Sequence, residues 1–489
     1  MNDPAALASI LSLARAGATN RAWEAFVDVG LDKQRSDPAV LTLKGRLLKD
    51  RARAAGGAAR AELFSQSAQA YTDAAAIQHT ASYPLINAAT MALFAGQGAQ
   101  AATLATQILT LLDSGLDNGE TPYWGEAARA EALLLLGRRS EAEASLERAI
   151  KLAPRGYEDH AVTLRQFRAI SKLVGDDAAW VDRFAPPPCL HFSGVIGISP
   201  DDQGAVTRIK EAVERIAPAF GFGALAAGAD ILIAEALLAR QAELYIYLPG
   251  SLEEFRAASV TPFGAAWLPR FEALIDAAAS VEILDGAQPV SSASIGLCEE
   301  LAMGCAIEHA RRLECVASSL RVTGDTDNRR ADIWTVTTLP LETLTLPRSA
   351  SLPDEPPLPA GKYVTYLALY GVSASETYPA ACGSWNEGDM TVFAFERIDD
   401  ALIALDTLRS NGAEHAIAAL DCRILETGID TDSMRALVVR MAKAAAPGAV
   451  VATKVAAMAT MLRKDHLRIE PLGEIASAAG GIDIYAVAL

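Results

Sequence analysis

The sequence predicts a multidomain protein: an all-α helical-repeat domain, then an α/β domain with a parallel sheet, then an α+β domain. Three observations predict this order. Up to about residue 184 the chain is rich in Ala and Leu at helical spacing and contains a repeat with a fixed register. After the run Pro186–Pro188, strand and helix patterns alternate. A second Pro-rich stretch precedes a further mixture of strands and helices, and 489 residues are too many for one core.

Composition and charge narrow the classes of function. With 51% hydrophobic and 21% charged residues, the chain has the composition of a globular protein. A net charge of −17 disfavours a nucleic-acid partner but is compatible with a small basic pocket for one nucleotide. The six scattered cysteines form no C-x-x-C motif, which is typical of reduced cytoplasmic thiols. The N-terminus lacks a signal-peptide pattern and no stretch is apolar enough to span a bilayer, so we expect a cytoplasmic protein with no membrane partner.

The helical repeat is visible when two segments are aligned, LFAGQGAQAATLATQIL and LLLGRRSEAEASLERAI. Gly96 then matches Gly137, a shift of 137 − 96 = 41 residues, and small or apolar residues follow at matching positions. A glycine that ends one helix, followed by a small-residue face on the next, is typical of stacked helix pairs. The second copy resembles the tetratricopeptide consensus. We therefore expect tetratricopeptide-type repeats over residues 1–184, forming an all-α solenoid.

Three segments of this region carry a more specific resemblance. They are LTLKGRLLKDRA from residue 41, YPLINAATMALFAG from residue 83 and YWGEAARAEALLLLG from residue 123. Together they resemble the TRAFs-binding tetratricopeptide domain of the apoptosis-signal-regulating kinases and its bacterial relatives. The resemblance implies that the domain senses a nucleotide-derived ligand, and it makes Tyr83, Asn87, Trp124 and Glu131 candidate pocket residues. In the alternative interpretation, the aromatic rings fill gaps between helices and the two polar side chains satisfy buried groups.

The middle region, residues 189–345, reads as a parallel sheet with connecting helices. LHFSGVIGI predicts a first strand over 190–198, residues 205–217 a helix, and GFGALAAGAD a Gly-rich turn before a helix over 231–240. ELYIYLP then predicts a buried strand over 243–249. This β-α-turn-α-β order favours a doubly wound sheet.

The same segments resemble the SLOG superfamily of Rossmann-like nucleotide-binding domains. The resemblance implies that Gly194, Gly223 and Gly228 let backbone N–H groups approach a phosphate. It also implies that Asp230 holds a ribose hydroxyl, or that Asp230 or Glu235 acts as the acid/base of a nucleotide N-glycosidase. The second Gly-rich turn of those hydrolases is missing from this sequence. A purely structural crossover would also use such a turn.

A metal-like group of residues, Cys298, Cys305 and His309, falls on one predicted helix over 293–312. Residues seven apart lie about 10 Å apart along a helix, whereas zinc ligands lie about 2.0–2.3 Å from the ion. We therefore expect a buried face and assign no metal.

After a Pro-rich linker over 346–362, residues 363–489 resemble a class III nucleotide cyclase domain. The matching blocks are VTYLALYGVS, NEGDMTVFAF, DDALIALDTLR and the final GGIDIYAVAL. Such enzymes hold two Mg²⁺ ions with two Asp residues. Here Leu369 stands at the first Asp position, while Asp389 matches the second.

Two further positions depart from the cyclase pattern. Trp385 stands at the base-reading Lys position and Ala436 replaces a helical Asn, while Arg440 remains. The resemblance therefore implies a pseudo-cyclase domain that keeps a dimer interface or a nucleotide groove. In the alternative interpretation, Asp389 lies in a hairpin turn and Arg440 forms a surface ion pair.

The favoured hypothesis is a signalling protein that senses a nucleotide or ADP-ribose-like ligand through its repeat and Rossmann-like domains and dimerises through its pseudo-cyclase domain. One alternative is a nucleotide N-glycosidase. The other is a scaffold that binds a protein partner through the repeats. No cofactor is assigned, and enzymatic activity is left open with a preference against it.

Overall fold

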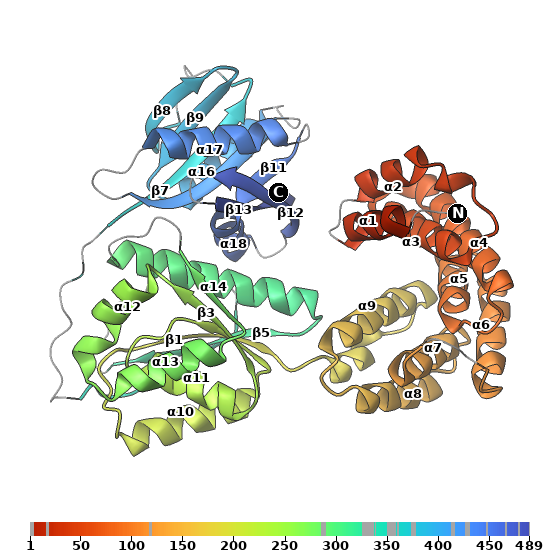
Figure 1. Ribbon diagram of the computed structural model, residues 1–489, viewed down its shortest axis with the longest axis horizontal. Coiled ribbons are helices and arrows are strands. Elements are labelled where there is room, and N and C mark those ends of the chain that lie inside the picture. Colours follow the sequence, from red (N-terminus) through yellow and green to blue (C-terminus); the bar gives the residue numbers. More distant parts are fainter. Residues whose placement is uncertain are drawn as a thin grey trace. The chain divides into compact units, whose positions relative to one another are not determined.

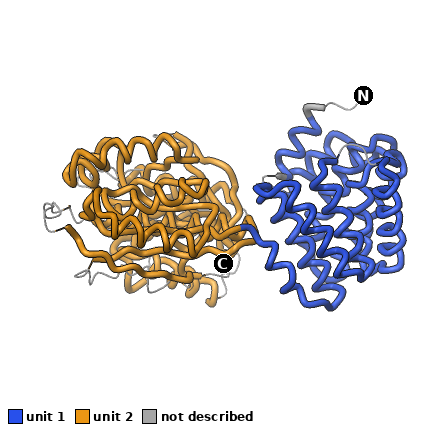
Figure 2. The backbone as a smooth tube through the Cα atoms, turned by 90° about the horizontal axis from the view of Figure 1, so that it is seen from below, with its two compact units in different colours: residues 1–186 blue, residues 187–489 orange. Residues whose placement is uncertain are grey.

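The computed structural model describes residues 4–15, 19–116, 120–284, 290–324, 339–349, 361–372, 378–411, 416–425, 431–445, 448–464, 467–477 and 480–488, with residues 337 and 358. The chain forms two compact units, residues 1–186 and residues 187–489 (Figure 2).

The first unit is all-helical; consecutive helices from α1 to α8 pack against each other, and α9 packs on α7 (Figure 1). Its helices are α1 (Pro4–Arg15), α2 (Thr19–Asp28), α3 (Pro38–Ala54), α4 (Gly57–Ile77), α5 (Ser82–Phe94), α6 (Gly98–Asp113), α7 (Pro122–Leu135), α8 (Arg139–Leu152) and α9 (Tyr157–Val174). Short 3₁₀ turns lie at Leu31–Lys33 and Ala178–Phe184. The predicted helical-repeat architecture is confirmed.

The predicted register is visible at the ends of two helices. Gly96 follows α5 with φ +79° and Gly137 follows α7 with φ +73°. At both sites the next N–H bonds back into the last helical turn, from Gln97 to the Ala92 carbonyl (2.8 Å) and from Arg138 to the Leu133 carbonyl (2.9 Å). This is the Schellman arrangement, in which glycine supplies the left-handed conformation. The two helix pairs α5–α6 and α7–α8 are therefore equivalent units.

The second unit begins with a six-stranded, all-parallel sheet in the order β4-β3-β2-β1-β5-β6. Its strands are β1 (Cys189–Gly194), β2 (Phe220–Gly223), β3 (Glu243–Leu248), β4 (Ser280–Ile283), β5 (Ala317–Thr323) and β6 (Leu341–Thr345). Its helices are α10 (Gln203–Ile216), α11 (Ala229–Ala239), α12 (Leu252–Ser259), α13 (Trp267–Ala277) and α14 (Ser292–Arg312). Helix α14 covers one face of the sheet, and α11 lies on the other with α10 and α13 (Figure 1).

The parallel sheet confirms the coarse prediction but changes one element. The segment GFGALAAGAD does not form a turn throughout, because Phe220–Gly223 is strand β2 and only the residues that follow make the turn. The side chains of Phe220 and Phe222 are buried, which explains the strand. The strand order reverses direction between β1 and β5, and such a switch point leaves a crevice at the carboxyl ends of the strands.

A second, mixed sheet follows in the order β12-β13-β11-β10-β7-β9-β8. Its strands are β7 (Lys362–Tyr370), β8 (Ala381–Glu387), β9 (Met390–Phe395), β10 (Ala418–Leu425), β11 (Val450–Thr453), β12 (Arg468–Ser477) and β13 (Gly480–Ala488). Its helices are α16 (Ile398–Ser410), α17 (Thr431–Ala444) and α18 (Lys454–Arg463). Alternate residues of β7, such as Val364 and Tyr366, pack in one core with α17. Both faces of this central strand are covered.

The two sheets belong to one compact unit because α14 packs directly on α18. At the crossing, a Cβ atom added to Gly304 would lie 2.5 Å from the Cβ of Met458. Arg463 donates to both oxygens of Glu300 at 2.9 and 3.1 Å and to Asp399 at 3.1 Å. Most of the predicted linker over 346–362 lies outside the described residues, but Ser349 still donates to the Gly197 carbonyl at 2.8 Å. Among the helices that the structure describes, none is long and apolar enough to cross a membrane.

Candidate functional site

Polar side chains from four helices of the repeat unit meet in one place. The side-chain amide of Asn87 on α5 donates to the Tyr83 carbonyl at 2.9 Å, and its oxygen accepts from Lys49 Nζ on α3 at 3.3 Å. One turn further along α5, the Thr90 hydroxyl donates to Glu131 on α7, which also accepts from Gln166 on α9 at 3.2 Å. We call this group the polar cluster; its members are Lys49, Asn87, Thr90, Glu131 and Gln166.

The polar cluster contains opposite charges that are partly withdrawn from water. Burial, with the nearby charge of Arg53, lowers the pKa of Lys49 to about 8. Burial raises the pKa of Glu131, although the hydrogen bonds from Thr90 and Gln166 and the charge of Lys49 partly oppose it. Both ions therefore pay a desolvation cost, and a ligand that satisfies either charge would offset it.

Tyr83 is linked to the polar cluster through its carbonyl, which accepts from Asn87. The residue is 38% exposed, and its ring meets the buried Tyr71 edge-on with 6.3 Å between ring centroids. Trp124 lies two helical turns from Glu131, about 10 Å along α7. Its ring packs at 5.1 Å on Tyr123. Of the predicted pocket residues, Tyr83 and Asn87 are joined through the Tyr83 carbonyl, and Glu131 contacts Thr90 one turn further along α5. The Trp124 ring contacts Tyr123.

Sequence reasoning missed the other members of the polar cluster. Lys49 lies within the segment that carries the family resemblance, but a lysine on a helix with basic neighbours is typical of a solvated surface. Thr90 and Gln166 carry no motif. Their roles depend on the stacking of α3, α5, α7 and α9, which links residues far apart in sequence.

A cavity of about 390 Å³ lies between the first helices of the repeat unit. Lys44 Nζ donates to the Asp32 carbonyl at 2.8 Å, and burial lowers the pKa of Lys44. The Asp32 Oδ1 atom is buried with no hydrogen-bond partner among the described residues. No motif marked this cavity in the sequence. Its lining residues are Trp23, Asp32, Arg35, Leu41, Lys44, Leu48, Gln66, Gln69, Ala70 and Asp73.

The predicted glycines of the middle region gather at the carboxyl ends of β1 and β2. An added Cβ would lie 2.3 Å from the Ala229 Cβ at Gly194, and 2.5 Å from the Phe192 carbonyl oxygen at Gly223. At Gly228, where φ is +122°, it would lie 2.8 Å from the Val195 carbonyl oxygen. At these three positions the closest atoms belong to the protein's own chain, so the glycines are required by internal packing.

Asp230 lies in the first turn of α11 and is 6% exposed. Its Oδ2 atom accepts from the Ala226 N–H at 3.2 Å. Burial raises the pKa of Asp230 to about 8, against the opposing effect of the backbone N–H groups of Ala226 and Gly194. The side chain therefore holds a proton near neutral pH and ties the Gly-rich turn to the end of β1.

Glu235, the other candidate acid/base, is held by Arg270 on α13. The Arg270 guanidinium donates to both carboxylate oxygens, with Nε at 2.6 Å from Oε1. Its third nitrogen donates to the Pro200 carbonyl at 3.2 Å, and the Trp267 ring lies 4.4 Å away. This fork ties α11 to α13 and to the loop after β1, so both Glu235 oxygens are already engaged.

Cys298, Cys305 and His309 lie on the buried face of α14, as the sequence analysis expected. They are 3%, 7% and 7% exposed. The His309 ring packs against Phe220 at 4.6 Å and Tyr245 at 5.3 Å. Within the described ranges, no group of His, Cys, Asp or Glu side chains is arranged to hold a metal.

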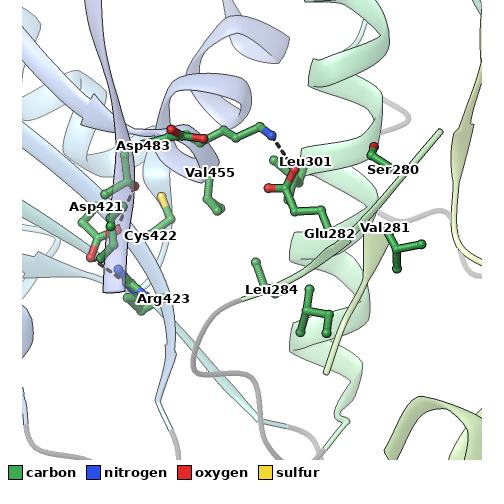
Figure 3. A pocket seen from close by; sticks show the side chains of 15 residues that line it. Ser280, Val281, Glu282, Leu284, Leu301, Asp421, Cys422, Arg423, Val455 and Asp483 are labelled. Atoms are coloured by element: carbon green, nitrogen blue, oxygen red, sulfur yellow. Dashed lines mark hydrogen bonds and ion pairs between the residues drawn. The ribbon is translucent and has the colours of Figure 1, made fainter. Parts of the chain in front are cut away.

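A further cavity, of about 370 Å³, lies at the seam between the two sheets of the second unit (Figure 3). On the side of the second sheet, the buried Asp421 accepts from Thr453 and from Arg423, each at 2.8 Å. On the other side, Glu282 of β4 pairs with Lys454 at the start of α18. Arg423 and Lys454 are thus each paired with a carboxylate that lines the cavity, which makes this cavity part of the contact between the two sheets.

The two cyclase-type candidates lie apart from this cavity. Asp389 is exposed in the tight turn between β8 and β9, beside Gly388 with φ +69°. Arg440 on α17 is exposed and donates to the Ala476 carbonyl of β12 at 2.9 Å. Leu369, at the first metal position, is fully buried in β7. Trp385 stacks under the Arg435 guanidinium at 4.7 Å.

Comparisons with known proteins bear on the repeat unit. Residues 3–92, from α1 into α5, match the family model described as Tetratricopeptide Repeats-Sensor. The prediction of tetratricopeptide-type repeats is thereby confirmed for this segment, and repeats of this type suggest a protein-interaction or regulatory role. No curated protein matches the chain.

Among solved structures, a mutant O-GlcNAc transferase from Thermobaculum terrenum is 15% identical over 64% of this chain, with a TM-score of 0.20. The match spans 58% of that protein's length. At this TM-score we draw no conclusion from the likeness.

Proposed function

We propose that the protein is a regulatory protein whose repeat unit binds a nucleotide-derived ligand at the polar cluster and Tyr83. The observation that carries the proposal is the pair of partly desolvated charges on Lys49 and Glu131, with the 38% exposed Tyr83 one helical turn before Asn87. The ring offers a stacking face for a base, Lys49 a charge for a phosphate, and Asn87 and Glu131 acceptors for ribose hydroxyls. The match of residues 3–92 to a sensor-type repeat model supports the same assignment.

Calorimetric titration of the full chain with NAD, ADP-ribose, ATP and cyclic nucleotides tests this proposal. We expect one of these ligands to bind, and Lys49→Met to weaken its binding about tenfold or more, since a lost charged hydrogen bond costs about 1.5–3 kcal/mol. Lys172→Met changes an exposed lysine of α9 in the same way and should leave the affinity unchanged. Failure of every ligand to bind would overturn the proposal. If no ligand bound and a protein partner co-purified with the chain, the alternative function, a scaffold that binds a protein partner through the repeats, would be favoured.

The second sheet would serve as a dimerisation module without cyclase activity. The proposal rests on the sequence resemblance and on Leu369, because an apolar side chain that is buried in β7 offers no oxygen to a divalent cation. Sedimentation velocity of the full chain should give a dimer, and incubation with Mg²⁺ and ATP or GTP should release no cyclic nucleotide. A monomer at micromolar concentration, or a cyclic product, would contradict this part of the proposal.

A nucleotide N-glycosidase is the second candidate, and Asp230 is the observation in its favour. An acid that is protonated near pH 7, at the carboxyl ends of parallel strands, could donate a proton to a leaving base. Incubation with nucleoside monophosphates should then release free base, and Asp230→Asn should abolish the release. Because Glu235 is already bound by Arg270, Glu235→Gln serves as the comparison variant.

A further inference from the structure

Two cysteines lie together at the amino-terminal edge of the parallel sheet. Cys189 is the first residue of β1 and directly follows the proline run that leaves the repeat unit. Cys315 lies between α14 and β5, and β5 is the parallel neighbour of β1. Their sulfur atoms are 3.8 Å apart. A disulfide bond is about 2.05 Å long, so the two atoms need to approach by about 1.7 Å.

Backbone hydrogen bonds fix both residues in this position. The Cys189 N–H donates to the Val316 carbonyl at 2.9 Å, which anchors the start of β1 next to Cys315. The Cys315 N–H donates to the Ala310 carbonyl of α14 at 2.9 Å, after Glu314 in the left-handed conformation with φ 57°. Cys315 is thus held by the C-terminal cap of α14. The backbones of both cysteines are therefore anchored next to each other.

The two thiols have different environments. Cys189 is fully buried, whereas Cys315 is partly exposed. The hydrogen bond from Cys189 lowers the pKa of Cys315, while the same contact and burial raise the pKa of Cys189. A partly exposed cysteine with a lowered pKa beside a buried thiol is the arrangement of an attacking and a resolving cysteine.

We propose that Cys189 and Cys315 form a reversible dithiol/disulfide modification site that reacts with hydroperoxides. The Cys315 thiolate attacks a peroxide oxygen, the O–O bond breaks, and Cys315 becomes a sulfenic acid while the leaving hydroxide takes up a proton. The Cys189 sulfur then attacks the sulfenic sulfur, forms the S–S bond and releases water with its own proton. Two thiols and one hydrogen peroxide thereby give one disulfide and two waters, and a dithiol reductant reverses the change.

The other cysteines are placed differently. Cys298 and Cys305 are seven residues apart on one helix, about 10 Å along its axis. The Cys422 sulfur accepts from the Tyr363 hydroxyl at 3.0 Å, and the exposed Cys382 donates to the Ala394 carbonyl at 3.3 Å. By exposure alone, Cys382 would be the cysteine expected to react with a peroxide. By the distance between sulfur atoms, Cys189 and Cys315 are the pair expected to form a disulfide.

The test is thiol counting on the full chain after treatment with hydrogen peroxide. Unreacted thiols are alkylated in denaturant, and the intact mass gives their number. We expect two of the six thiols to be lost, a peptide map that joins Cys189 to Cys315, and recovery of both thiols with dithiothreitol. Retention of all six thiols, or a disulfide that joins other cysteines or two chains, would overturn the proposal.

Two variants separate this pair from general oxidation. Cys382→Ser removes the exposed cysteine and should still lose two thiols on oxidation. Cys189→Ser removes the resolving thiol, so Cys315 should accumulate as sulfinic acid with no disulfide. If circular dichroism shows that Cys189→Ser is unfolded, the peptide map of the wild-type chain decides alone. Oxidation of Cys382 in place of the pair in the wild-type chain would contradict the proposal.

Discussion

At the scale of single residues, burial changes the charge state of two side chains in opposite senses. The pKa of Lys49 is lowered to about 8, so this lysine loses its proton at a lower pH than an ordinary lysine. The pKa of Asp230 is raised to about 8, so this carboxylic acid keeps its proton to a higher pH than an ordinary aspartate. Both shifts arise because a charge is removed from water. The shift at Lys49 predicts that ligand affinity depends on pH, and the shift at Asp230 predicts that the free energy of unfolding depends on pH. A substitution at the same position should remove each dependence.

Binding of an anionic ligand at the polar cluster should weaken as the pH rises through 8. Below that pH Lys49 carries its charge, and above it the neutral amine no longer attracts a phosphate. Titrations of the full chain at pH 7 and pH 9 should show the loss, and in Lys49→Met the affinity should be weak at both values. Equal wild-type affinity at the two pH values would place the anion elsewhere.

The stability of the fold should show the titration of Asp230. Its pKa is raised in the folded state, so between about pH 4 and pH 8 the folded chain binds more protons than the unfolded chain. The free energy of unfolding contributed by this residue therefore falls as the pH rises, by up to about 1.4 kcal/mol per pH unit. Asp230→Asn retains an acceptor for the Ala226 N–H and should lack this fall. Urea unfolding of both chains across this pH range measures the effect. If the free energy of unfolding changed with pH equally in the wild-type chain and in Asp230→Asn, the prediction would be contradicted.

At the scale of elements, the crossing of α14 and α18 joins the two sheets of the second unit. Gly304→Ala should destabilise it by about 1–3 kcal/mol, because the new methyl group would overlap both the Met458 side chain and its backbone. Gly296→Ala places the same methyl group on the same helix with nothing within 4 Å, so it should be neutral or slightly stabilising. Thermal unfolding of the two variants measures the difference. If the two substitutions changed the stability equally, helices α14 and α18 would be able to move apart at the crossing without loss of stability.

The sequence predicted local features of these elements well and their contacts poorly. The glycines at 96 and 137 marked two helix ends because a left-handed conformation leaves a local signature. The parallel sheet followed from the alternation of patterns, although β2 was mistaken for part of a turn because its glycines concealed a short buried strand. Two of the five members of the polar cluster, Asn87 and Glu131, lay in motifs, whereas Lys49 resembled a surface residue. The crossing at Gly304 had no signal, because its partner lies more than 150 residues away.

At the scale of the whole molecule, the candidate ligand sites differ in how far the protein's own atoms occupy the space and pair the charges. In the parallel sheet, the glycine positions are packed by the chain itself, and Glu235 is bound by Arg270. In the seam between the sheets, Lys454 and Arg423 are paired with Glu282 and Asp421. In the repeat unit, Lys49 and Glu131 are also hydrogen-bonded within the polar cluster, but both are partly desolvated and Tyr83 on α5 is 38% exposed. For this reason we propose the repeat unit as the ligand site.

Hydrogen–deuterium exchange of the full chain, with and without the nucleotide that binds in titration, tests whether the ligand binds to the repeat helices. We expect slower exchange in α3, α5 and α7 on binding, and no such change in Lys49→Met at the same ligand concentration. Slower exchange confined to the end of β1 and the start of α11, with the repeat helices unchanged, would contradict it.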